Sequence, residues 1–84
     1  MPNPFTGRTT IRYSIPSASP AVVNVYDATG RMIRTLRDAS HGPGEHSVTW
    51  DGKNGGGEDV PAGIYLYELR WNGHSETKRM LLMR

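Results

Sequence analysis

The sequence contains no cysteine among its 84 residues. The chain therefore has no disulfide bonds, no thiolate metal ligands and no nucleophilic thiol. Long apolar runs are also missing, since none approaches the ~18 consecutive apolar residues of a membrane-spanning helix. A domain of this length folds on packing and hydrogen bonds alone, and it has little room for a buried active-site cavity.

Net charge is also small. Ten Lys and Arg residues against eight Asp and Glu residues give a formal charge of +2, which is too little to predict nucleic-acid binding. The cations gather in residues 1–37 and 78–84, whereas the acids gather in residues 38–77. Two interpretations are open: strands of opposite charge lie side by side, or the basic tail contacts a partner.

Apolar and polar residues alternate with a period of two along most of the chain. This pattern is typical of half-buried strands, and it covers residues 11–15, 21–26, 45–50 and 64–71. Residues 31–36 form the partner strand after a tight turn at 27–30, and the adjacent Met32 and Ile33 indicate a bulge. Residues 75–84 form the last strand after Asn72-Gly73, a two-residue hairpin turn of the primed type.

Glycine and proline mark the connections. Residues 16–20 interrupt the strand pattern, and the Gly42-Pro43-Gly44 sequence predicts a loop between sheets over residues 38–44. Residues 51–63 carry five glycines and predict a long turn that Val60 anchors to the core. These turn signals between short strands, without a helical period, predict an all-β protein: an Ig-like antiparallel β-sandwich of about seven short strands.

We expect one domain over residues 1–84, with residues 1–8 as an extended, linker-like opening. Trp50 is predicted to be the centre of the core, because no other side chain here removes as much apolar area from water. The predicted structural core comprises Tyr13, Val23, Val25, Val48, Trp50 and Leu69. Residues 1–4 lack the charged and apolar regions of a secretory signal, and we expect the chain to be a module of a longer protein.

Nothing in the sequence predicts catalysis. The three histidines, at positions 41, 46 and 74, lie outside any recognisable motif, so we predict no enzyme activity, no catalytic residue and no cofactor. The loop at 51–59 is rich in oxygen ligands, but Lys53 and Gly55 stand where an EF-hand needs its second and third ligands. We interpret Asp51 and Asn54 as turn-formers, which leaves a weak calcium site at these two residues as the alternative to no metal.

Aromatic residues next to cations, at Arg12-Tyr13 and Arg70-Trp71, raise the possibility of nucleic-acid binding. Trp71 with Tyr65 or Tyr67 similarly suggests a platform for a sugar. All of these rings lie at core-facing positions of the strand pattern, which favours a structural role and predicts no nucleic-acid partner.

The apolar run at residues 80–83 has side chains for both faces of a sheet. Such a run predicts either a partner-binding edge or a central strand that is covered on both faces.

The order and spacing of several motifs resemble a known family. These motifs are Pro2-Asn3-Pro4-Phe5, Thr9-Thr10-Ile11-Arg12-Tyr13, Val25 to Arg31, Trp50 to Asn54, Gly57, Val60, Gly63 to Tyr67, and Lys78-Arg79-Met80-Leu81-Leu82. Together they cover essentially the whole chain. The chain resembles the type A carboxy-terminal sorting domain of the type IX secretion system, a relative of the Ig-like domain of the flagellar hook-capping protein. Thr6-Gly7 departs from the family's usual asparagine-proline continuation.

The resemblance implies a non-catalytic module that directs an exported cargo, an amino-terminal enzyme or adhesin, through the periplasm to the cell surface of a Gram-negative bacterium. Its implied partners are an outer-membrane translocon, which recognises the domain, and a sortase, which usually removes it. The implied recognition residues are Pro2, Asn3, Pro4, Phe5, Gly63, Tyr65, Tyr67 and the stretch Lys78 through Arg84, including Arg79, Met80, Leu81 and Leu82. The alternative is an accessory Ig-like spacer or carbohydrate-binding module of a secreted multidomain enzyme.

Overall fold

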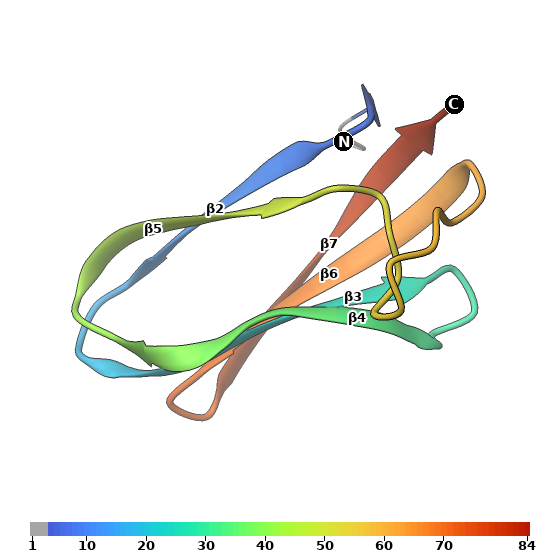
Figure 1. The fold of residues 1–84 in the computed structure, drawn as a ribbon. Coiled ribbons are helices and arrows are strands. Elements are labelled where there is room, and N and C mark those ends of the chain that lie inside the picture. The colour runs from blue at the N-terminus through green and yellow to red at the C-terminus, as the bar shows by residue number, and fades with distance from the viewer. Residues whose placement is uncertain (1–3) are drawn as a thin grey trace.

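The computed structural model describes residues 4–84, without the side chains of residues 38, 40 and 41, and the chain forms two layers of strands (Figure 1). In chain order the strands are β1 (Pro4–Thr6), β2 (Thr9–Ile15), β3 (Ser19–Asp27), β4 (Met32–His41), β5 (Gly44–Trp50), β6 (Gly63–Trp71) and β7 (His74–Met83). None of the described elements is a helix that could cross a membrane.

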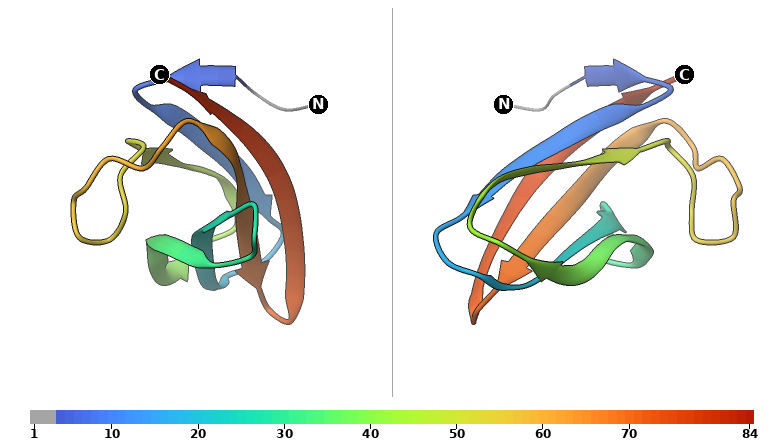
Figure 2. Two further views of the ribbon diagram at one scale, coloured as in Figure 1. Left: turned by 90° about the vertical axis from the view of Figure 1, so that its right-hand side faces the viewer. Right: turned by 60° about the vertical axis from the view of Figure 1, so that its left-hand side comes forward.

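The strands divide unequally between the layers. The larger sheet has the order β1-β7-β6-β3-β4, and the smaller sheet pairs β2 with β5. All neighbours are antiparallel except β1 and β7, which run parallel. Figure 2 shows the smaller sheet lying across one face of the larger one. The predicted all-β, Ig-like sandwich of about seven strands is therefore confirmed.

Two short turns that the sequence predicts join pairs of antiparallel strands. Asn72 and Gly73 both have positive φ angles, 45° and 79°, as a primed turn between β6 and β7 requires. In the turn between β3 and β4, the Asp27 carboxylate accepts hydrogen bonds from the amides of Thr29 and Arg31 at 2.9 and 3.0 Å. The carbonyl of Asp27 also accepts from the Gly30 amide at 3.0 Å.

The prediction of a loop over residues 38–44 is wrong in its extent. β4 continues to His41, because the backbones of residues 39–41 pair with residues 19–21 of β3. Only Gly42 and Pro43 separate β4 from β5, which begins at Gly44. Pro20 is likewise part of β3 rather than of a break, and it lies beyond the ladder with β6, which starts at Ala21. Its missing N–H therefore costs no hydrogen bond to β6.

The register between β3 and β4 shifts twice, between Val23 and Asn24 and between Val25 and Tyr26. The two shifts are β-bulges in the pairing of β3 with residues 32–37. They lie close to the position where the adjacent Met32 and Ile33 interrupt the alternation of apolar and polar residues.

The core lies between the two sheets around Trp50, whose exposed fraction is 0%. Alternate residues of the facing strands surround it, as the period of two requires. The buried apolar residues are Ile11, Tyr13, Ile15, Ala21, Val23, Val25, Trp50, Val60, Tyr65, Leu69, Met80 and Leu82. Val48 is only partly buried and packs against this cluster.

Candidate recognition site on three neighbouring strands

Three distant stretches of the chain meet at one end of the larger sheet. β7 lies between β1 and β6, so that residues 4–6 face residues 81–83, which in turn lie beside the start of β6. Specifically, Phe5 pairs with Leu82, and Leu82 pairs with Gly63 on its other side. The residues that the resemblance implies for recognition are thus neighbours in space wherever the structure describes them, whereas Pro2 and Asn3 lie outside the described residues.

The opening of the chain is part of the sheet from Pro4 onward. Pro4–Thr6, within the stretch expected as a linker, forms the edge strand β1. The partly buried Phe5 packs edge-on against Trp50, with ring centroids 5.8 Å apart. β1 is therefore attached both by its backbone to β7 and by its ring to the core.

The apolar end of β7 is internal to the larger sheet at Leu81 and Leu82. Met80 and Leu82 are 1% and 0% exposed, Leu81 is half-buried, and Met83 is 49% exposed. β1 pairs with the backbone at residues 81–83 on one side, and β6 pairs with it as far as Leu82 on the other. Of the two interpretations of this run, the covered strand therefore holds at Leu81 and Leu82, whereas Met80 has no neighbour on the β1 side among the described residues and Met83 is 49% exposed. Lys78 and Arg79, just before it, are exposed.

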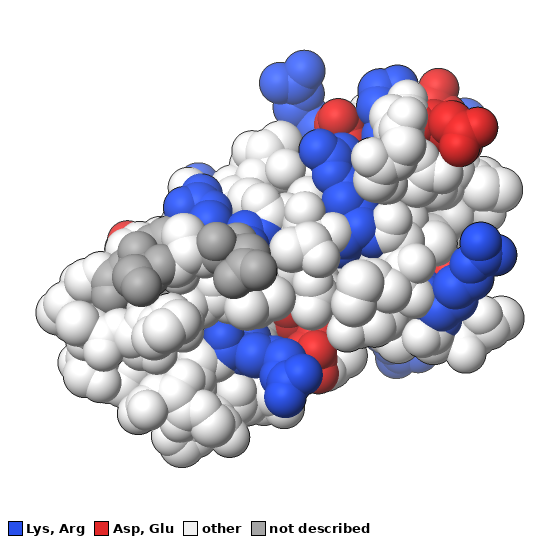
Figure 3. All heavy atoms as spheres, turned by 60° about the horizontal axis from the view of Figure 1, so that its bottom comes forward, with Lys and Arg blue, Asp and Glu red and all other residues white. Residues whose placement is uncertain are grey.

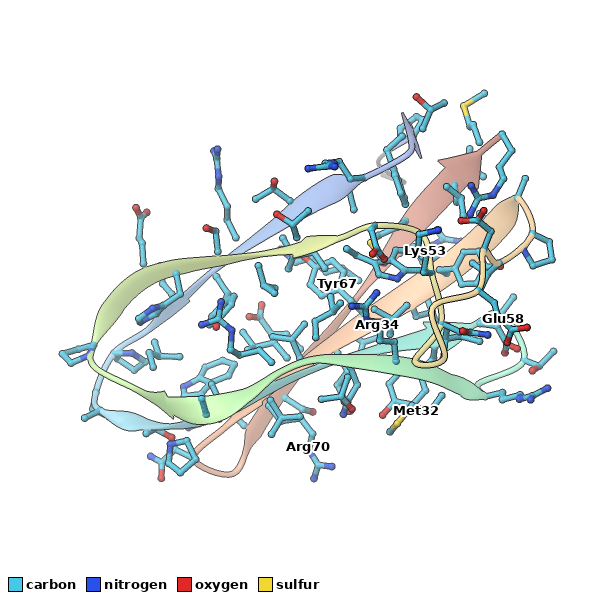
Figure 4. All side chains as sticks on the ribbon, viewed as in Figure 1. Met32, Arg34, Lys53, Glu58, Tyr67 and Arg70 are labelled. Carbon is cyan, nitrogen blue, oxygen red and sulfur yellow. The ribbon has the colours of Figure 1, made fainter. Side chains whose placement is uncertain are left out.

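The two β6 tyrosines that the resemblance implies for recognition point toward the smaller sheet but differ in burial. Tyr65 is buried against Trp50, with ring centroids 5.2 Å apart, and its hydroxyl donates to the Pro61 carbonyl at 2.6 Å. Burial raises the pKa of Tyr65, and the negative charge of Asp27 raises it further. Tyr67 is half-buried, and Figure 4 shows it between the layers. Burial also raises the pKa of Tyr67, with a second contribution from Glu76.

Arg84 fastens the end of β7 to the loop that follows Trp50. Its Nε donates to the Val60 carbonyl at 2.8 Å, and its Nη2 donates to the Gly52 carbonyl at 2.8 Å. The same guanidinium lies 3.8 Å from the Asp59 carboxylate. No local motif signals this contact, because Arg84 and Gly52 are 32 residues apart in the sequence.

The loop at 51–60 is held by its own polar side chains. Asp51 accepts from Arg34 at 2.6 Å and from the Lys53 amide at 3.1 Å. The Asn54 side-chain oxygen accepts from the amides of Gly56 and Glu58 at 3.0 Å each. Figure 4 shows Arg34, Lys53 and Glu58 gathered around this loop.

Asp51 and Asn54 thus act as turn-formers here, and calcium binding at them stays an untested alternative. Among the described residues, no group of three or more His, Asp or Glu side chains is placed to hold a metal ion. Lys53 forms an ion pair with Asp59 at 2.9 Å, and its hydrogen bond and charge lower the pKa of that carboxyl.

The other residues considered for chemistry have structural surroundings. His46 lies 2.8 Å from the Gly42 carbonyl and stacks on Tyr13, with ring centroids 5.6 Å apart. Trp71 stacks against His74 at the opposite end of β6 from the buried Tyr65. Tyr65 and Trp71 therefore do not form one exposed platform for a sugar ring.

Exposed charge on the face seen in Figure 3 is divided into separate groups. Lys and Arg side chains stand apart from one another across a mostly uncharged surface, and acidic side chains gather mainly at one end. This face lacks the continuous basic stripe that is typical of a nucleic-acid-binding surface.

Comparison with known proteins gives the family. The model of the FlgD Ig-like domain matches residues 4–75. The basal-body rod modification protein FlgD of Salmonella typhimurium is 40% identical over 48 residues, which are 57% of this chain and 21% of that protein. This chain belongs to the FlgD Ig-like domain family, and it spans about a fifth of the length of the curated relatives that it matches.

Two solved structures from Porphyromonas gingivalis have the same fold. One is dimeric latent PorU, with a TM-score of 0.78 and 28% identity, covering 98% of this chain and 9% of PorU. The other is PorZ, described as an essential bacterial surface component of the type IX secretion system, with a TM-score of 0.57 and 18% identity. That likeness covers 89% of this chain and 11% of PorZ, and at this identity it shows the fold alone.

Proposed function

We propose that this domain is a non-catalytic sorting module that directs an attached cargo through the type IX secretion system to the cell surface. The translocon would recognise the β1-β7-β6 end of the larger sheet, and a sortase would cut the chain before β1. The cargo, an enzyme or adhesin, would be joined on the amino-terminal side.

One observation carries this proposal. The implied recognition residues come from residues 4–5, 63–67 and 78–84, yet they occupy three adjacent strands. A translocon could therefore read them as one folded surface, with the exposed Lys78 and Arg79 beside it. The likeness to PorU over 98% of this chain supports such a module, because it occupies only 9% of PorU.

The FlgD relationship favours a second candidate. Identity of 40% over 48 residues to the basal-body rod modification protein FlgD of Salmonella is consistent with a module that takes part in modifying a basal-body rod. In that case the domain would bind neighbouring subunits and would carry no export information for a fused cargo. A spacer or glycan-binding role in a secreted enzyme stays the alternative predicted from the sequence.

A reporter fusion tests the sorting role. A signal peptide and a fluorescent protein are placed before residues 1–84 in a bacterium that has a type IX system, and surface fluorescence is compared in strains with and without the translocon. Lys78→Glu with Arg79→Glu should abolish surface display while the fusion accumulates in the periplasm. Arg70→Glu is the matched control, because Arg70 is equally exposed and points away from the smaller sheet (Figure 4). Translocon-independent display, or normal display of the double variant, would refute the proposal.

A further inference from the structure

One edge of the larger sheet is open along most of β7. This strand pairs with β6 along its length, but among the described residues β1 covers its other edge only at residues 81–83. A groove between β2 and β7 borders the uncovered part, and its two adjoining hollows measure about 500 and 540 Å³. Residues 75–79 are all exposed there. An edge of this kind is a template for another strand.

The backbone groups that this edge offers belong to every second residue. A primed turn at Asn72-Gly73 directs the amide of His74, the residue that follows it, toward β6. Successive residues of an antiparallel strand turn their N–H and C=O groups to opposite sides. The backbone groups of Ser75, Thr77 and Arg79 are therefore the ones that face the open edge.

The side chains on this edge carry charges of both signs. Glu76 and Lys78 pair with Leu69 and Tyr67 of β6, so both project on the side of the smaller sheet. Both are exposed, and neither forms an ion pair with another described side chain. The edge thus presents one acid and one base on the same face, on either side of Thr77.

A second copy of the same edge, running antiparallel, complements this pattern. When Thr77 lies opposite its own copy on a two-fold axis, Glu76 of each chain lies opposite Lys78 of the other. Ser75 of each chain then lies opposite Arg79 of the other, and the backbone groups that face the open edge meet in both copies. One stretch of sequence therefore supplies both halves of the contact, as a two-fold interface requires.

The neighbouring registers lose this complementarity. Sliding one copy by two residues places Lys78 opposite its own copy, and sliding it the other way places Glu76 opposite its own copy. Like charges directly opposite each other are destabilising. Sliding by one residue sets backbone groups that face the edge against groups that face β6. The register centred on Thr77 is therefore favoured by both the charges and the backbone.

We propose that two copies of this domain associate edge to edge through residues 75–79 of β7, in the antiparallel register centred on Thr77. The two larger sheets become one continuous sheet, with a Glu76–Lys78 ion pair on each side of the axis. The contact stops before residues 81–83, where β1 already pairs with β7. Beyond the turn at residues 72–73 each chain returns along β6, on the side away from the other copy. Because so short a contact buries little area, the association is weak and reversible.

Charge reversal in the purified chain tests the register. Glu76→Lys and Lys78→Glu each set like charges against each other, so either variant alone should dimerise on the order of tenfold more weakly than the parent. An equimolar mixture of the two variants should associate, because every acid again meets a base of the other copy. The chain that carries both substitutions should recover self-association for the same reason.

Sedimentation equilibrium over a range of concentrations measures these associations. Arg70→Glu is the control and should dimerise like the parent, because Arg70 lies on β6, away from the open edge. Circular dichroism checks that each variant is folded. Added salt should weaken the parent dimer, since its ion pairs are exposed to solvent.

Amide NMR locates the contact. The amides of residues 75, 77 and 79 should become protected from hydrogen exchange as the concentration rises, whereas those of residues 76 and 78, which face β6, should change little. Thr77→Pro removes the N–H group on the axis without removing a hydrogen bond to β6, so it should abolish dimerisation while the domain stays folded.

Several results would overturn the inference. A parent chain that stays monomeric at millimolar concentration is one, and a mixture of the two single variants that associates no better than either alone is another. Concentration-dependent shifts in residues 9–15 would place the contact on the free edge of β2 instead. A dimer that persists on dilution and survives charge reversal would show exchange of a whole strand between copies. Because export is not measured, the sorting proposal can fail while this one stands, and the reverse also holds.

Discussion

The guanidinium of Arg84 donates a hydrogen bond of 2.8 Å to the carbonyl of Gly52, and this contact joins the end of β7 to the loop after the core tryptophan. β7 also pairs with β1 and β6. The strands of the proposed recognition surface are therefore held by backbone pairing, and its last residue is held by the Arg84 contact. The conformation that a translocon would meet is therefore set by the folded core and not by a flexible tail.

Removing this contact should destabilise the domain moderately. Arg84→Ala deletes two hydrogen bonds from a charged donor, to Val60 and Gly52, and its side chain is 34% exposed. We expect a loss of about 1–2 kcal/mol in the free energy of unfolding, below the full value for a buried charged donor because solvent screens the group. Urea denaturation measures it, with Arg70→Ala as the control. An unchanged midpoint for Arg84→Ala would show that the contact does not contribute in solution.

A side chain at Gly52 should destabilise the domain more than a side chain at Gly57 in the same loop. Both have positive φ angles, 75° and 83°. A Cβ at Gly52 would lie 3.1 Å from the Arg84 guanidinium and 3.2 Å from the Gly7 carbonyl, whereas a Cβ at Gly57 meets nothing within 4 Å. We expect Gly52→Ala to cost about 2–3 kcal/mol and Gly57→Ala about 1 kcal/mol. Equal costs in thermal or urea unfolding would contradict the close approach.

The hydrogen bonds to the Asp27 carboxylate should make the free energy of unfolding depend on pH in the acidic range. The hydroxyl of Thr29 donates to the Asp27 carboxylate at 2.6 Å, and this bond together with the Arg31 and Thr29 amides lowers the pKa of Asp27 below its ordinary 3.8. A lowered pKa in the folded state means that the contribution is complete above 3.8 and is lost as the pH falls through the folded value. Thr29→Val should therefore raise the pKa of Asp27 in an NMR titration, and Thr29→Ser should preserve it. A pKa that is the same in both variants would exclude the hydroxyl as the cause.

Much of the fold was predictable because local patterns decide it. The alternation at residues 11–15 and 64–71, and the Asn72-Gly73 turn, predict strands and a hairpin that the structure contains. The extent of β4 was not predictable, since residues 38–41 lack strand alternation and extend the strand only by backbone pairing with β3. Pro43, two residues after His41, limits how far β4 can extend, but it does not show at which residue the strand stops.

The site was predictable in part, for a different reason. The resemblance supplied the residues, but their adjacency depends on the parallel pairing of Pro4 with Leu81, which no local pattern encodes. The apolar end of β7 was equally consistent with an open or a covered strand, because the sequence of one strand does not show what lies beside it. The contact from Arg84 to Gly52 and the groove along β2 and β7 are long-range features of the same kind.

Replacement by phenylalanine should affect the stability of the domain differently at the two tryptophans. The indole N–H of Trp50 donates to the Lys53 carbonyl at 2.9 Å, whereas that of Trp71 is buried without a partner among the described residues. Trp50→Phe removes that hydrogen bond and leaves a void in the centre of the core, so we expect a loss of about 2–3 kcal/mol. Trp71→Phe loses packing but relieves a desolvated donor, so its stability should stay within about 1 kcal/mol of the parent. Urea unfolding of both variants, followed by circular dichroism, gives the comparison. Similar losses for the two substitutions would mean that the Trp71 N–H finds an acceptor in solution, such as a bound water.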